Sequence, residues 1–137
     1  MDTAQYRKAE VKWPVVIETD ERSIDGVTWE VSPDGIFIRC AKPLRLNEVC
    51  DLTIQVPGGD CSLEASAEVV WSNIYGQDDE ITPRGMGLRF LGISSEHRQL
   101  IAKRVFQKLK SENADPRELE ALETIMTDQD EIGSEAA

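Results

Sequence analysis

Metal ligands and catalytic groups are scarce in this sequence. It has one histidine, His97, and three widely spaced cysteines at positions 40, 50 and 61. A zinc site needs about four clustered nitrogen or sulfur ligands, and an odd number of cysteines leaves a thiol outside any disulfide framework. The sequence also has no glycine-rich phosphate loop and no nucleophile paired with a histidine. We therefore expect reduced, largely buried thiols, no metal, no cofactor, no catalytic residue and no enzymatic activity.

Long hydrophobic runs are missing as well. No stretch approaches the roughly 18 apolar residues that a membrane-spanning helix needs. The N-terminal segment "MDTAQYRK" lacks the apolar core of a signal peptide. We therefore expect a cytoplasmic protein that does not insert into a membrane.

Basic residues are almost absent from the C-terminal segment. Residues 111–137 contain nine acids against one base, Arg117, and account for most of the formal net charge of −11. Binding to a nucleic acid polymer requires a basic face, which this charge balance does not provide. A small anionic ligand held by a few local cations remains compatible with it.

Apolar and polar residues alternate over most of residues 11–91, which is the pattern of half-buried strands. The segments "VKWPVVIET", "VCDLTIQV", "SLEASAEVVW" and "GMGLRF" all show this period of two. Turn chemistry separates the runs, as in Asp25-Gly26 and Pro33-Asp34-Gly35. About six short strands with one apolar face each predict a mainly β fold, either an antiparallel barrel or a sandwich.

Two helices are expected after these strands. Ser94 is a suitable N-cap for the segment "HRQLIAKRVFQKLK", which has apolar residues mostly on one face. Asp115-Pro116 with Glu118 is a capping pattern for a second, short acidic helix over about residues 116–126. We expect residues 127–137 to be disordered. The chain is thus divided into a domain at 1–110 and an acidic extension at 111–137.

The second expected helix carries a narrow apolar stripe. The stripe must be buried against the same chain, a second copy or a partner protein. We predict that it is a partner-binding surface, and its residues are Leu119, Leu122, Ile125 and Met126.

The segment "WEVSPDGIFIRC", residues 29–40, joins two apolar runs through a Glu-x-Ser-x-x-Gly step. One interpretation is an ordinary turn between two strands, in which Pro33-Asp34-Gly35 supplies the turn chemistry. The other is the wall of a ligand site, because a carboxylate, a hydroxyl and a bare backbone come together there.

With this strand order, the chain resembles the PilZ domain family over about residues 4–109. The resemblance is carried by "YRKAEVKWPVVIE" at the first strand, the Glu-x-Ser-x-x-Gly step, "AEVVW" and the closing "GMGLRFLGIS". It implies a six-stranded antiparallel β-barrel with a C-terminal helix and no catalysis. It also implies a role in binding the bacterial second messenger cyclic di-GMP and transmitting that state to a partner.

The binding signature of the family combines Arg-x-x-x-Arg with Asp/Asn-x-Ser-x-x-Gly, and this chain departs from both parts. Ser32 and Gly35 match, whereas Glu30 replaces the shorter acid or amide. Upstream, the two arginine positions hold Ala4 and Lys8, or Lys8 and Lys12 in the other register, and Arg7 lies beside them out of register. Lysine is a point charge and lacks the planar fork with which arginine grips a phosphate.

Two functions follow from the resemblance. The first is a non-enzymatic signalling adaptor with weak or lost nucleotide binding, which works through a regulatory protein partner or through self-association of its C-terminal helices. The alternative is a functional cyclic di-GMP receptor. In that case Arg7, Lys8 and Lys12 would meet the phosphates and Glu30, Ser32 and Gly35 would surround a guanine.

Overall fold

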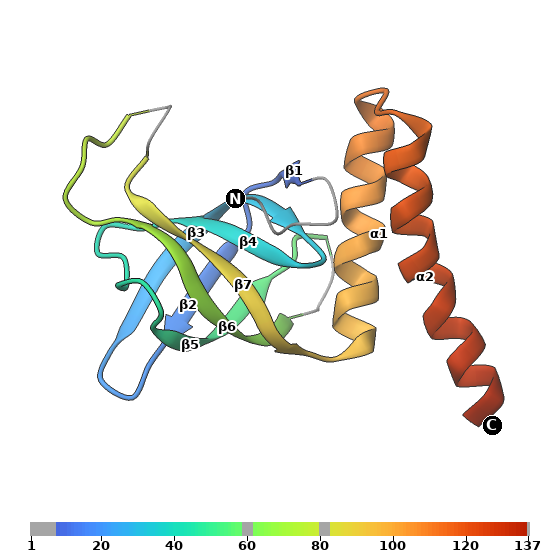
Figure 1. Ribbon diagram of the computed structural model, residues 1–137, viewed down its shortest axis with the longest axis horizontal. Helices are drawn as coiled ribbons and strands as arrows, with labels where there is room; N and C mark the ends of the chain where they lie inside the picture. Colours follow the sequence, from blue (N-terminus) through green and yellow to red (C-terminus); the bar gives the residue numbers. More distant parts are fainter. Residues whose placement is uncertain (1–7, 59–61, 80–82, 137) are drawn as a thin grey trace.

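The computed structural model describes residues 8–58, 62–79 and 83–136, with side chains described as far as Met126 in the last helix. Within these residues the elements are β1 (Ala9–Glu10), β2 (Pro14–Glu18), β3 (Ser23–Ser32), β4 (Gly35–Arg39), β5 (Val49–Gln55), β6 (Ser62–Asn73), β7 (Gly85–Ile93), α1 (Ser95–Ser111) and α2 (Pro116–Ala136). Figure 1 shows them as a barrel with the two helices at one end.

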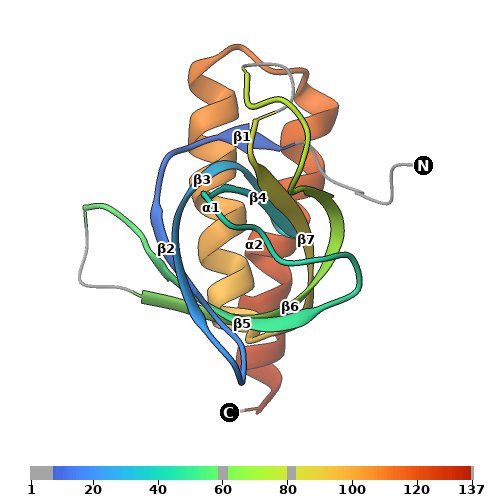
Figure 2. The same cartoon turned by 90° about the vertical axis from the view of Figure 1, so that its left-hand side faces the viewer.

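The six long strands form a closed antiparallel barrel. Their order is β3-β2-β5-β6-β7-β4, and an additional pairing of β4 with β3 closes the sheet. Figure 2 shows the barrel in front of the helices. The predicted six-stranded barrel is confirmed. The two-residue β1 is an addition to it and pairs with the end of β3 that β2 leaves open.

The alternating residues fill the barrel as the sequence predicts, except where the strands carry bulges. Leu52, Ile54 and Leu63 are buried in a continuous core. A register shift between Val69 and Trp71 breaks the alternation in β6. Val69 is fully buried, but the side chain of Trp71 is 40% exposed on the outer surface. A bulge adds one residue to one strand, so it turns the following side chain to the other face.

Helix α1 lies between the barrel and α2 (Figure 1). Ser94 accepts a hydrogen bond from the backbone N–H of His97, which confirms the expected N-cap. The carboxylate of Asp115 accepts one from the N–H of Arg117 at the start of α2. Both contacts satisfy amide groups that a helix N-terminus leaves without partners.

The second helix is longer than the sequence predicted. It continues to Ala136, through residues 127–136 that were expected to be disordered. The extra segment contains no proline and a single glycine, and extending a formed helix costs far less than starting one. The division of the chain at residue 110 stays a prediction.

The apolar stripe of α2 is covered by α1 of the same chain. Leu122 is fully buried and Ile125 is 7% exposed. Leu119 and Met126 are partly buried against the same core. The stripe is therefore covered by the same chain, which is one of the three possibilities that the sequence left open, and its role as a partner-binding surface stays a prediction.

Candidate functional site

The Glu-x-Ser-x-x-Gly step forms the turn between β3 and β4. Ser32 is fully buried, and its hydroxyl oxygen accepts hydrogen bonds from the backbone N–H groups of Asp34 at 3.2 Å and Gly35 at 3.3 Å. The hydroxyl also lies 3.4 Å from the carbonyl oxygen of Gly35, to which it donates. Ser32 therefore braces the turn from inside, and its hydroxyl already has partners.

Gly35 is required by the close approach of β7. A Cβ at this position would lie 2.3 Å from the carbonyl oxygen of Leu88, a backbone atom that cannot move aside as a side chain would. Gly35 pairs directly with Arg89 in that strand. Its match to the family signature thus has a packing reason that involves no ligand.

The turn is also attached to its surroundings through Asp34. The Asp34 carbonyl oxygen accepts a hydrogen bond of 2.9 Å from the N–H of Phe90. Its carboxylate lies 3.8 Å from the guanidinium of Arg98 on α1. The step therefore contacts both the neighbouring strand and the helix.

The N-terminal basic segment lies alongside this step, as the family resemblance implies. In β1, Ala9 pairs with Val31 and Glu10 pairs with Glu30. Lys8, Glu10 and Lys12 are exposed and alternate with more buried residues, so they share the outer face. Arg7 lies outside the described residues.

A buried threonine holds this segment against β3. The Thr28 hydroxyl donates to the carbonyl oxygen of Val11 and accepts from the N–H of Trp13 at 2.8 Å. The backbone N–H of Val11 also donates to the carbonyl oxygen of Trp29 at 3.1 Å. The position of Lys12 relative to the step is therefore fixed by hydrogen bonds on both sides of it.

An aromatic group that sequence reasoning did not assign to the site lies next to Glu30. A register shift between Thr28 and Glu30 accompanies the pairing of Glu30 with Phe37. The rings of Trp29 and Phe37 meet edge to face at 5.8 Å, and Phe37 and Trp71 are 5.2 Å apart. Gly87 pairs with both Phe37 and Trp71, so no side chain separates the two rings.

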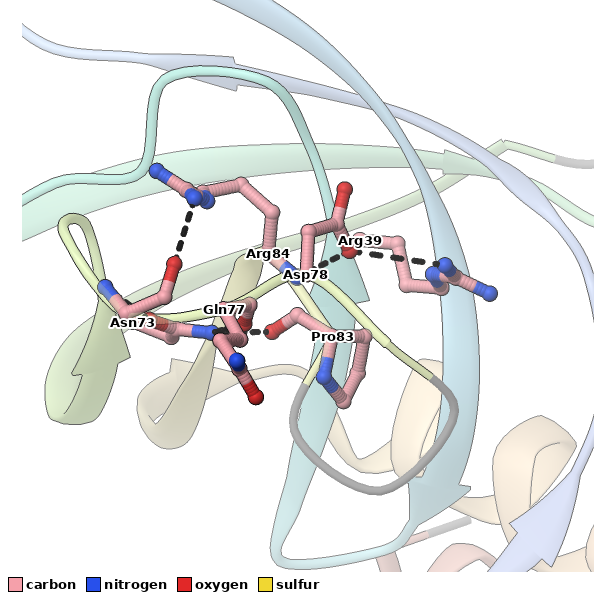
Figure 3. Close-up of polar contacts among 7 residues, drawn as sticks. Arg39, Asn73, Gln77, Asp78, Pro83 and Arg84 are labelled. Carbon is pink, nitrogen blue, oxygen red and sulfur yellow. Dashed lines mark hydrogen bonds and ion pairs between the residues drawn. The ribbon is translucent and has the colours of Figure 1, made fainter.

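Arg39 adds a guanidinium to this aromatic group. It lies over the ring of Trp29 at 5.2 Å and within 3.8 Å of the Asp78 carboxylate. Figure 3 shows Asp78 between Arg39 and Arg84, whose backbone N–H donates to Asp78 at 2.8 Å. No spacing in the sequence points to this arrangement, because two bulges and a loop contact bring the residues together.

The loop that carries Asp78 is braced from its base. The side-chain amide of Asn73 donates to the carbonyl oxygens of Gln77 at 2.8 Å and Pro83 at 3.1 Å, as Figure 3 shows, and its oxygen accepts from the N–H of Gly76 at 2.8 Å. The Arg84 guanidinium donates to the carbonyl oxygens of Ile74 and Gly76. These contacts fix the backbone that positions Asp78 beside Arg39.

The cysteines and the possible metal ligands can now be located in the structure. Cys40 and Cys50 are buried free thiols, and burial raises the pKa of each to about 11. Cys61 lies outside the described part of the chain. Within that part, no three His, Cys, Asp or Glu side chains gather as a metal ion would require. None of the described helices is both long and apolar enough to cross a bilayer.

Comparison with known proteins now decides the family. The model of the PilZ domain family matches residues 2–107. The chain belongs to the PilZ domain family. PilZ domains are generally non-catalytic binding or adaptor domains, and the match does not include α2. Among curated proteins, no match is found.

Solved PilZ structures share the fold at low sequence identity. The inhibitor of motility MotI/DgrA from Bacillus subtilis has a TM-score of 0.67 at 21% identity, with 81% of this chain and 53% of that chain covered. The PilZ domain of YcgR from Escherichia coli, solved with c-di-GMP, has a TM-score of 0.58 at 12% identity and coverages of 80% and 94%. The PilZ domain of CeSA from a cellulose-synthesizing bacterium has a TM-score of 0.51 at 14% identity and coverages of 74% and 96%. This chain thus spans about half the length of the Bacillus protein, and the likeness to all three establishes the fold.

Proposed function

We propose that this PilZ domain is a non-enzymatic signalling adaptor in cyclic di-GMP-linked regulation, with weak or lost nucleotide binding, that acts through protein contacts. The observation that carries the proposal is the pairing of Glu10 with Glu30 at the face where the family signature would hold the ligand. Two further features of the same face support it.

The first supporting feature is the charge on this face. Lys8 and Lys12 are offset by Glu10 and Glu30, and Arg39 is offset by Asp78, so these six side chains present no net positive charge to a ligand with two phosphates. Glu10 and Glu30 are nearest neighbours across the strands and add a repulsive contribution that falls with salt. Lysine also cannot make the bidentate contact of a guanidinium.

The second supporting feature is the structural use of the matched residues. The Ser32 hydroxyl is occupied within its own turn, and Gly35 is required by the Leu88 carbonyl. Both residues would be retained for folding even if no nucleotide bound. Their presence therefore does not argue for tight binding.

A functional cyclic di-GMP receptor is the second candidate. It is favoured by the position of Lys8 and Lys12 beside the step, and by Arg39 with its aromatic neighbours next to Glu30. Guanidinium groups grip phosphates, and aromatic faces stack on nucleobases. In this version Arg7, Lys8 and Lys12 would meet the phosphates, Arg39 and Trp71 would add contacts, and Glu30 would accept from a guanine.

Calorimetric titration with cyclic di-GMP at low and physiological salt tests the proposal. We expect no detectable heat at millimolar ligand in physiological salt. Micromolar or tighter binding that Arg39→Ala abolishes, and that Arg117→Ala leaves unchanged, would overturn the proposal in favour of the receptor. Arg117 is an exposed arginine on α2, which α1 separates from the barrel, and it serves as the matched control.

A gain-of-binding variant tests where the site is. Ala4→Arg, Lys8→Arg and Glu30→Asp together restore the family signature, and we expect them to produce measurable binding. If the triple variant gains nothing, the ligand face is not at this step.

A further inference from the structure

Arg39 lies on the outer wall of the barrel, where its direct strand neighbours carry no charge. It pairs with Val27 on β3 and with Gly85 on β7. Neither neighbour offers a carboxylate to the guanidinium, which instead lies over the ring of Trp29 at 5.2 Å from the centroid. A guanidinium stacked in this way is preorganised to grip an anion, because its planar fork is already oriented.

The carboxylate that meets Arg39 comes from outside the strands. Asp78 belongs to the segment between β6 and β7, and its Oδ1 lies 3.8 Å from the Arg39 guanidinium. The two side chains are 49% and 53% exposed, so the contact is open to competing ions. An ion pair with this exposure adds little to the stability of the fold. Its main consequence is that the charge of Arg39 is already offset.

The position of Asp78 does not depend on Arg39. The same carboxylate oxygen accepts a hydrogen bond of 2.8 Å from the backbone N–H of Arg84. The guanidinium of Arg84 donates to carbonyl groups that precede Asp78, and Asn73 donates to carbonyl groups on both sides of it (Figure 3). A carboxylate that is held in place needs no further ordering. It therefore competes with an external anion at an effective concentration of about millimolar or more.

The surface beside this ion pair is aromatic and open to solvent. Phe37 and Trp71 both lie opposite Gly87, and their rings are 5.2 Å apart. Trp71 is 40% exposed. Together with Trp29 these rings form an aromatic face around Arg39. Such rings can stack on a flat group of a ligand, and a guanidinium beside them can hold a phosphate attached to that group.

We propose that Asp78 is an intramolecular competitor for the ligand of the aromatic face. Its carboxylate takes the place of an external phosphate at Arg39 and keeps the affinity of the face for anions low. The inference deepens the function proposed above, because it names a residue that makes nucleotide binding weak, and it rests on that function for the identity of the ligand. Removing the charge of Asp78 leaves a guanidinium that is stacked, oriented and free to bind.

The first test contains no nucleotide and uses iodide, an anion that quenches tryptophan fluorescence. Asp78→Asn removes the charge and keeps a side-chain oxygen for the N–H of Arg84. We expect the Stern–Volmer constant for iodide at low salt to rise about two-fold in this variant, while the constant for neutral acrylamide stays unchanged. The rise should vanish when Arg39→Gln is added. Equal iodide constants in Asp78→Asn and the unchanged chain would overturn the proposal, as would a rise that persists without Arg39.

Two controls separate this effect from a general one. Glu120→Gln makes the same charge change at an exposed position of α2, which α1 separates from the barrel (Figure 1). Its iodide constant should match that of the unchanged chain, and a rise as large as that of Asp78→Asn would refute the competition. The Gly76 amide donates to the Asn73 side chain. Its hydrogen exchange should be equal in Asp78→Asn and the unchanged chain, since the carbonyl oxygen of asparagine can still accept from Arg84.

The second test concerns the ligand and uses the triple variant described above, which is expected to bind cyclic di-GMP. Adding Asp78→Asn to it should raise the affinity about 3- to 10-fold at low salt, measured by calorimetry. No gain would show that Asp78 does not compete with the nucleotide, and the proposal would be wrong. If the triple variant itself does not bind, the nucleotide site is misplaced. The iodide result then still decides whether Asp78 competes for Arg39.

Discussion

Glu10 lies directly opposite Glu30 across the pairing of β1 with β3. Side chains of directly opposite residues in an antiparallel pair project to the same face, and like charges at such positions are destabilising. The two carboxylates therefore weaken the attachment of the N-terminal strand and oppose the approach of an anion. This pair differs from the basic surroundings that the family signature implies for the step.

Glu10→Lys should stabilise the domain and favour anion binding. Converting a like-charge pair to an opposite-charge pair is worth about 0.5–1 kcal/mol across two strands. We expect a rise of that size in the free energy of unfolding from urea titration, and a several-fold gain in affinity for cyclic di-GMP at low salt. Asp20→Lys makes the same charge change in the exposed β2–β3 turn and should give neither effect. Equal behaviour of the two variants would contradict the prediction.

Ser32→Ala should destabilise the fold whether or not nucleotide binds. It leaves the N–H groups of Asp34 and Gly35 without their acceptor, and an unsatisfied buried donor costs about 1–3 kcal/mol. Urea unfolding followed by tryptophan fluorescence measures the loss. The matched control is Ser23→Ala, at the exposed first residue of β3, which should change stability by less than about 0.5 kcal/mol. A Ser32→Ala chain as stable as this control would mean that the hydroxyl does not brace the turn.

Gly35 and Gly87 should differ in how far they tolerate alanine. A Cβ on Gly35 would overlap the Leu88 carbonyl oxygen, whereas on Gly87 it would meet Phe37 and Trp71 at an ordinary 3.6 Å. We expect Gly35→Ala to cost about 3 kcal/mol, at the upper end of overpacking penalties. Gly87→Ala should lie within about 1 kcal/mol of the unchanged chain, because reduced freedom of the unfolded state offsets any minor strain. Thermal and urea unfolding of the two variants decide this, and similar losses at both positions would contradict it.

The buried thiols should make stability fall at alkaline pH. Burial raises the pKa of Cys40 and of Cys50 from 9.0 to about 11. The folded chain therefore keeps both protons while the unfolded chain releases them, so the contribution is complete below pH 9 and declines as pH rises from 9 to 11. The shift corresponds to about 3 kcal/mol per thiol at the high-pH limit. Unfolding measured from pH 8 to 11 should show a shallower decline in Cys50→Ala than in the unchanged chain, and parallel curves would count against the assignment.

Asn73→Ala should loosen the loop between β6 and β7 while leaving the barrel folded. Three backbone contacts, to Gly76, Gln77 and Pro83, depend on this side chain. We expect faster hydrogen exchange at the Gly76 amide and a weaker contact of Asp78 with Arg39. Gln77→Ala, which changes an exposed side chain of the same loop, is the control. If exchange at Gly76 is the same in both variants, Asn73 does not hold the loop.

The barrel could be predicted from the sequence because its signal is local. Alternation in a segment such as 49–56 depends only on which side chains face the core, and the structure buries Cys50, Leu52, Ile54 and Val56 as expected. The bulge before Trp71 could not be predicted, since it depends on pairing with β7 and leaves no composition signal. The closure of β3 on β4 is likewise a property of the whole sheet.

The turn between β3 and β4 could be found from the sequence, but the assignment of a ligand site to it stays a prediction. The spacing from Glu30 to Gly35 marks a turn that the structure does contain, and the segment with Lys8 and Lys12 pairs with the strand beside it. The role of Gly35 depends on how closely Leu88 approaches from a strand 53 residues away in the chain. The group formed by Trp29, Phe37 and Arg39 likewise depends on long-range pairing, because a bulge in β3 brings these residues together. Long-range backbone geometry of this kind is not encoded in any short motif.

Closure of the barrel restricts how other proteins can bind to it. Each of the six long strands has a hydrogen-bonded neighbour on both sides over part of its length, so many of the backbone amides of the barrel are already engaged. Recognition by strand addition, in which an extended peptide joins the edge of a sheet, is therefore limited to short segments such as the start of β3 before Val27, where the pairing with β4 has ended. A protein that binds to the barrel would therefore contact mainly side chains on its wall or pack against a helix. The specificity of such binding would come from side-chain chemistry, and the sheet backbone would serve to position those side chains.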